Sequence, residues 1–185
     1  MKYVLFLAAA FASLTVVAGN NPVIKSARLD KSQSTITYHM NHPMHSWDGV
    51  SKAVDGIVQY DEKSLQISKV AIAVKVSSFD SDNSNRDSHM MEVTEAIKYP
   101  NVTFVSTAIT DNGSILDITG TLSFHGVSKS IHFTATKTRS GNRISVTGNF
   151  IILIEEYNLE RPSLMMVKTD NEVGMKFTAV FDLVP

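Results

Sequence analysis

Apolar and polar residues alternate with a period of two along most of this chain. The segment ISKVAIAVKVSSF (67–79) has valine or isoleucine at positions 70, 72, 74 and 76, and mostly small or polar residues between them. Such alternation is typical of a strand that buries one face, whereas an amphipathic helix repeats every three or four residues. The pattern predicts eight strands, at residues 34–40, 53–60, 67–79, 101–110, 115–126, 130–137, 143–153 and 173–184.

Short turns and one irregular segment connect these strands. Turns rich in Asp and Gly, at 60–63, 111–113 and 140–142, predict antiparallel neighbours in a meander. The segment 80–100 breaks the period: it begins with capping residues, continues with helix formers and ends at a proline. We therefore expect one helix or two short ones between the third and fourth strands, with Ser84 or Asn85 as the N-cap.

Eight antiparallel strands with one apolar face can close into a barrel, because closure removes the exposed sheet edges. The interior of such a barrel holds side chains or one elongated ligand. The sequence therefore predicts an all-β, eight-stranded antiparallel barrel, with an open sandwich as the alternative. An outer-membrane barrel is disfavoured because Lys69 and Lys75 lie in mid-strand and aromatic girdles are missing. The candidate core or channel-lining residues are Phe104, Leu116, Ile118, Phe124, Phe133, Phe150, Phe177 and Phe181.

The first residues have the layout of a secretory signal peptide. Lys2 precedes an apolar run from Tyr3 to Val17, and Ala18 follows as a small residue at the expected cleavage position. The run of about 15 residues is shorter than the roughly 20 that span a bilayer. We expect residues 1–18 to be removed and 19–185 to form one periplasmic or secreted domain without a membrane span.

Composition narrows the classes of partner. The chain has no cysteine, which excludes disulfides and the lipid-attachment cysteine of a lipoprotein. Without residues 1–18, which contain one charge at Lys2, the net charge is about −2. This overall charge gives no electrostatic footprint for nucleic acid or for an anionic membrane. The oligomeric state does not follow from the sequence.

Two motifs resemble those of a known family. Arg86-Asp87-x-His89-Met90 is followed about ten residues later by Tyr99-Pro100-x-Val102-x-Phe104, and a second motif reads GTLSFHGVSK (120–129). In this order they are similar to the YceI family of exported bacterial proteins, over roughly residues 30 to 183. The segments VTEAIK (93–98) and EEYNLERPSLMMV (155–167) differ from the family's usual sequence.

The resemblance implies a lipocalin-like barrel with eight strands, a helical insertion and an apolar interior channel that can hold an isoprenoid chain. A non-catalytic carrier of a long-chain isoprenoid or quinone-like lipid is the function that it favours. The sequence adds no nucleophile elbow and no Gly-rich phosphate loop, so neither an enzyme nor a cofactor is expected.

Three histidines, in HMNHPMHSWDG (39–49), could in principle hold a metal ion. His39 and His42 would point to opposite faces of a strand, and Pro43 prevents a helix that would bring them together. His45 follows directly after this turn, and no cysteine completes a zinc site. We expect a polar strand end or turn, and an exported metal-binding protein using His39, His42 and His45 remains an alternative.

Arg86, Asp87 and His89 raise the question of catalysis, since a carboxylate can orient a histidine and an arginine can hold an anion. The other interpretation is structural: Asp87 suits the first turn of a helix, and Arg86 attaches the insertion to the barrel. We favour the structural role. A third functional hypothesis is an accessory protein that shields a quinone for a redox partner in the membrane.

Overall fold

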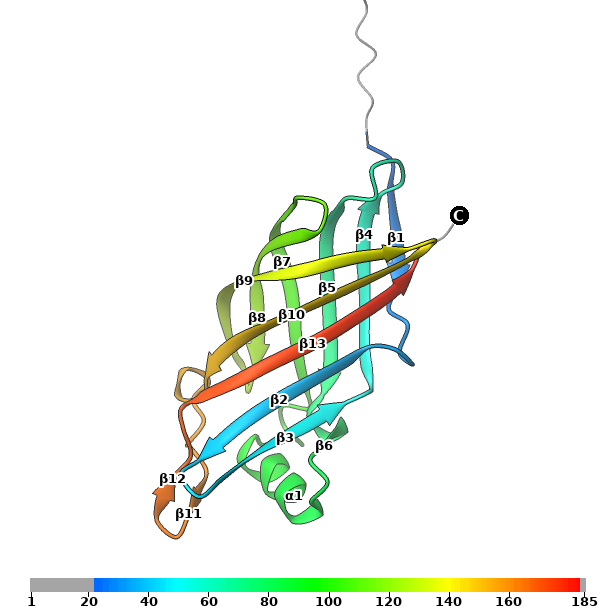
Figure 1. Ribbon diagram of the computed structural model, residues 1–185. Helices are drawn as coiled ribbons and strands as arrows, with labels where there is room; N and C mark the ends of the chain where they lie inside the picture. The colour runs from blue at the N-terminus through cyan, green and yellow to red at the C-terminus, as the bar shows by residue number, and fades with distance from the viewer. Residues whose placement is uncertain (1–21, 184–185) are drawn as a thin grey trace, which may run out of the picture.

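The alternating segments form one long, curled antiparallel sheet (Figure 1). The computed structural model describes residues 22–183. Within them the main sheet has eleven strands in the order β1-β4-β5-β7-β8-β9-β10-β13-β2-β3-β6. The strands are β1 (Ile24–Arg28), β2 (Thr35–His42), β3 (His45–Ser51), β4 (Val54–Asp61), β5 (Ile67–Lys75), β6 (Phe79–Asp80), β7 (Asn101–Asp111), β8 (Ile115–Phe124), β9 (Val127–Ser140), β10 (Arg143–Leu153) and β13 (Glu172–Asp182).

Smaller elements complete the fold. They are the helix α1 (Ser84–Val93), the 3-10 turns η1 (Val76–Ser78) and η2 (Ile154–Tyr157), and a separate two-stranded pair, β11 (Ser163–Leu164) with β12 (Val167–Lys168). Within residues 22–183, no helix is long and apolar enough to cross a bilayer. The expected signal peptide, residues 1–18, lies outside the described residues.

The sheet bends strongly along β9. The first part of this strand pairs with β8 (127–136) and its last part pairs with β10 (135–140). The half containing β10, β13, β2 and β3 therefore crosses in front of the half containing β1, β4, β5 and β7 (Figure 1). At one end, Leu29 forms a bridge with Phe181 of β13, and the Asp30 N–H donates to the Val180 carbonyl at 2.7 Å. These contacts bring the two halves of the curled sheet together.

The expected count of eight strands was wrong for a physical reason. The eight alternating segments correspond to β2, β4, β5, β7, β8, β9, β10 and β13, and the sheet adds β1, β3 and β6. β1 and β3 (IKSAR and HSWDGVS) carry charged or polar residues and little alternation, and β6 has two residues. Their pairing follows from neighbouring strands rather than from their own sequence.

The helix lies inside the expected segment 80–100, but it follows the sixth strand because the additional strands raise the count. Its N-cap is Asn83 rather than Ser84 or Asn85. The Asn83 side chain accepts a hydrogen bond from the Arg86 N–H at 3.1 Å, which satisfies one of the free donors of the first turn.

Candidate functional site

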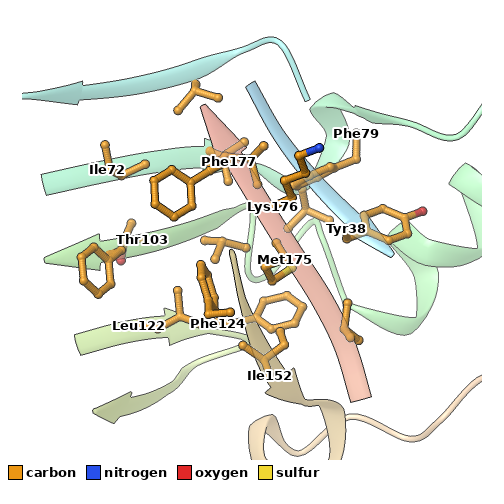
Figure 2. A pocket seen from close by; sticks show the side chains of 18 of the residues that line it. Tyr38, Ile72, Phe79, Thr103, Leu122, Phe124, Ile152, Met175, Lys176 and Phe177 are labelled. Atoms are coloured by element: carbon orange, nitrogen blue, oxygen red, sulfur yellow. The ribbon is translucent and has the colours of Figure 1, made fainter. Parts of the chain in front are cut away.

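An apolar cavity lies between the two halves of the sheet. Its volume is about 260 Å³, against the roughly 10–15 Å³ that one water molecule needs. Figure 2 shows side chains from several strands around this space, among them Tyr38 of β2, Ile72 of β5, Leu122 and Phe124 of β8, and Met175 and Phe177 of β13. A cavity with this lining suits an apolar ligand.

The structure places all eight candidate lining residues on the cavity wall: Phe104, Leu116, Ile118, Phe124, Phe133, Phe150, Phe177 and Phe181. Phe133 lies at the centre of the aromatic group, with ring centroids 5.0 Å from Phe150, 5.5 Å from Phe104 and 5.7 Å from Phe177. Their contact with a ligand belongs to the proposed function below.

Sequence reasoning missed many other lining residues. Some follow the same alternation on strands already identified, including Tyr38, Met40, Val58, Ile72, Val74, Ile152 and Met175. The period of two could have found these. Others come from the helix and from the segment after β10, namely Arg86, His89, Met90, Val93, Thr94, Leu159 and Pro162. Their position depends on how the insertions fold back over the sheet, which the local pattern does not indicate.

One end of the cavity is closed. Val58, Leu116 and Phe181 line it there with at most 2% of their surface exposed. Leu29 also lines it, and its bridge to Phe181 joins the two halves of the sheet. A ligand would not enter by this end without opening the sheet.

The other end opens beneath α1. His89 lines the cavity although 55% of its side chain is exposed, so the cavity meets solvent at this helix. We call this opening, lined by Arg86, His89, Met90 and Val93 of α1 together with Pro162, the mouth. An elongated ligand would therefore have one buried end and one end near solvent.

Polar side chains on the cavity wall are few. Arg86, His89 and Thr94 lie in or next to α1, whereas Thr103 lies on β7 and Lys176 and Thr178 lie on β13. The Arg86 guanidinium lies 5.0 Å from the centre of the Trp47 ring, and its Nη1 donates to the Ser81 carbonyl at 3.4 Å. Burial raises the pKa of the nearby Tyr38 hydroxyl, which therefore stays neutral at physiological pH. The mouth thus places a cation and a histidine beside the apolar side chains of Met90, Val93 and Pro162, an arrangement that can bind a long chain with a polar end.

Comparison with known proteins identifies the family. Residues 28–181 match the YceI-like domain. The chain belongs to the YceI-like family. It is 33% identical over 137 residues to protein YceI of Escherichia coli O157:H7, with 71% of each chain covered. It is 32% identical over 136 residues to protein YceI of Salmonella newport strain SL254, again with 71% of each chain covered.

Solved structures share the YceI-like fold. BcnA of Burkholderia cenocepacia is 22% identical with a TM-score of 0.73, over 82% of this chain and 98% of that chain. A polyisoprenoid-binding domain from Saccharophagus degradans, implicated in plant cell wall breakdown, is 15% identical with a TM-score of 0.68, over 86% and 98%. At these identities the likeness extends to the fold alone.

The three histidines of this YceI-like protein lie on the β2–β3 hairpin, where His42 pairs with His45 across the turn. The Met44 N–H donates to His42 Nδ1 at 3.2 Å, so His42 Nε2 carries the proton that it donates to the Val167 carbonyl at 3.0 Å. His39 contacts the Asp48 and Asn41 side chains through its two ring nitrogens. Among residues 22–183, no three His, Cys, Asp or Glu side chains are arranged to hold a metal ion.

Replacing His39, His42 and His45 together with Ala should leave the zinc affinity of the protein unchanged and weaker than micromolar. The physical reason is that both nitrogens of His39 and of His42 are already hydrogen-bonded. Isothermal titration with zinc measures this directly. Stoichiometric submicromolar binding that the triple substitution abolishes would favour the metal-binding alternative.

The motif Arg86, Asp87 and His89 does not converge into a catalytic group. The Asp87 carboxylate accepts hydrogen bonds from the Ser81 hydroxyl at 2.6 Å and from the Ser81 N–H at 3.2 Å. His89 Nδ1 lies 3.7 Å from Glu92 Oε2, and both side chains are more than half exposed. Asp87 thus fixes the entry to the helix, and Arg86 contacts β3 through Trp47.

Proposed function

We propose that this protein is a non-catalytic carrier of a polyisoprenoid or similar long-chain lipid, which lies in the apolar cavity with its polar end at the mouth. The observation that carries the proposal is a cavity lined mainly by apolar side chains, with fully buried residues at one end and Arg86 of α1 at the other. Membership of the YceI-like family and the fold shared with a polyisoprenoid-binding domain support it.

Burial of the tail would supply most of the affinity. A drug-sized ligand gains about 0.3 kcal/mol per heavy atom, so a tail of some 40 carbons could contribute on the order of 12 kcal/mol. Such a lipid would therefore move from water into the cavity with few specific hydrogen bonds to the protein. We further propose that the protein acts after export, in the periplasm or outside the cell, because residues 1–18 have the pattern of a signal peptide.

Trp47 offers a direct test of binding. It is the only tryptophan of the chain and it lines the cavity beside Arg86. Protein emptied by organic extraction, refolded and titrated with a polyprenol of about 40 carbons should show a saturable change in Trp47 emission; geraniol, with a much shorter tail, should bind far more weakly. Equal affinity for both alcohols, or no change with either, would contradict the proposal.

Arg86→Ala should distinguish between polar ends of the lipid. Loss of a charge-assisted hydrogen bond costs about 1.5–3 kcal/mol, so binding of a polyprenyl phosphate should weaken by roughly tenfold to a hundredfold. Binding of the uncharged polyprenol should stay the same, since its tail contacts are unchanged. Trp47 emission would measure the binding of both ligands. The emission signal needs a separate calibration in the variant, because Arg86 lies over the Trp47 ring. An equal loss for both ligands would mean that Arg86 shapes the mouth rather than binding the polar end.

A further inference from the structure

The segment 163–168 forms a small hairpin outside the main sheet. Ser163 pairs with Lys168 and Leu164 pairs with Val167, which leaves Met165 and Met166 as a two-residue turn. In Figure 1 this hairpin lies at the same end of the molecule as α1 and the β2–β3 turn. Its base is on the cavity wall, because Pro162 lines the cavity and its carbonyl accepts the Thr169 N–H at 2.8 Å.

The backbone of this turn is unusual for methionine. Met165 and Met166 have φ of 51° and 67°, in the left-handed region. A two-residue turn with positive φ at both positions is the type that favours Asn-Gly, since side chains with a Cβ are strained there. The requirements of the turn therefore do not explain two methionines, and strained positions of this kind are concentrated at functional sites.

The side chains of the turn are exposed. The exposed fractions are 75% for Met165, 99% for Met166 and 43% for Val167, and Met44 at the β2–β3 turn is 63% exposed. The two hairpins are tied together by the His42–Val167 hydrogen bond and by a bond from the Asp170 N–H to the Asn41 carbonyl at 2.9 Å. We call Met44, Met165, Met166 and Val167 the methionine rim. Grouped exposed apolar side chains mark a surface that contacts another apolar phase.

The charge and size of the rim favour a membrane over a protein partner. Between Pro162 and Thr169 the only charged residue is Lys168, which is positive. A lysine beside apolar residues can bury its stem while its ammonium group reaches lipid phosphates. A stable protein interface needs about 800 Å² on each partner, whereas a bilayer can admit single side chains.

We propose that the methionine rim docks this protein on the surface of a lipid bilayer that contains anionic phospholipid, with the mouth of the cavity next to the membrane. The inference rests on the proposed function in one respect: a carrier that takes its lipid from a bilayer must bring its mouth to that bilayer. The docking itself depends on the rim and not on the cargo.

The test is flotation of the purified protein with vesicles of phosphatidylethanolamine and a minority of phosphatidylglycerol. The variant combines Met165→Asn with Met166→Gly, which removes the apolar tip and supplies the residues that the turn favours. Since removing each inserted methionine should reduce partitioning on the order of tenfold, the variant should bind vesicles about a hundredfold more weakly. Its urea midpoint should equal or exceed that of the wild type. Ile115→Ser, on an exposed residue at the start of β8, is the control and should float like the wild type.

Flotation is measured both on protein as purified and after organic extraction, so that docking is separated from cargo. Absence of lipid in the extract would count against the carrier function alone. No flotation of the wild type, or equal flotation of the variant, would overturn the docking proposal. A dimer in sedimentation that the variant loses, without flotation, would assign the rim to a second copy of the chain and would also overturn it.

Discussion

Phe133→Asp should abolish lipid retention and remove most of the stability of the fold. The Phe133 ring is 9% exposed and contacts three other phenylalanine rings on the cavity wall. Loss of a buried ring costs about 3–5 kcal/mol, and an unpaired buried carboxylate adds several more. Since domains of this size are stable by about 5–15 kcal/mol, urea unfolding should show a protein that is unfolded or close to it.

Two further variants separate the cavity from the fold. Phe133→Leu keeps an apolar side chain, so it should remain folded and lose only part of its bound lipid. Thr136→Asp places the same charge on an exposed residue of the same strand and should change the free energy of unfolding by less than about 1 kcal/mol. Wild-type stability and lipid content in Phe133→Asp would mean that this ring does not face an apolar ligand.

Asp111→Ala should lower the free energy of unfolding by about 3–5 kcal/mol. The Asp111 side chain is 2% exposed and forms an ion pair with Lys137, whose side chain is 12% exposed. Asp111 Oδ2 also accepts the Ile67 N–H at 2.8 Å, so this carboxylate joins β5, β7 and β9. Removing the Asp111 carboxylate leaves the Lys137 ammonium group buried without its partner. This lowers the free energy of unfolding more than removing both charges together does.

Matched substitutions test that explanation. Changing Asp111→Asn and Lys137→Met together removes both charges and should recover much of the loss. Asp182→Ala breaks the ion pair with Arg143. The Asp182 side chain is 56% exposed and that of Arg143 is 41% exposed, so solvent screens this pair and the urea midpoint should change little. If Asp111→Ala and Asp182→Ala had equal effects in urea unfolding, burial would not be the cause.

Alternation predicted the strands that bury one face, and it failed where a strand is held by its neighbours. Ile72 and Val74 repeat every second position, so β5 was identifiable. β3 has only Trp47 and Val50 as large apolar residues and was missed. Asp111 was interpreted as a turn residue, because nothing in the local sequence shows that Lys137, 26 positions later, lies beside it.

The candidate site was predictable in part for the same reason. The eight apolar candidates for core or channel lining lie on the cavity wall, because the face of a strand follows from its period. Their contact with a ligand stays a prediction. The mouth was not predictable: Arg86 was expected to attach the insertion to the barrel, and its position on the cavity wall depends on how α1 folds over the sheet. The exposed Met165-Met166 turn likewise contradicts local preference, so no sequence rule points to it.

The most direct test of the carrier function is mass spectrometry of the protein produced in its own cell envelope. Native spectra taken before and after organic extraction should differ by the mass of a bound lipid, and the extract should contain a long-chain isoprenoid, a quinone or a similar lipid in near-stoichiometric amount. An extract without any long-chain lipid, together with an experimental structure whose interior is filled by side chains, would contradict the account.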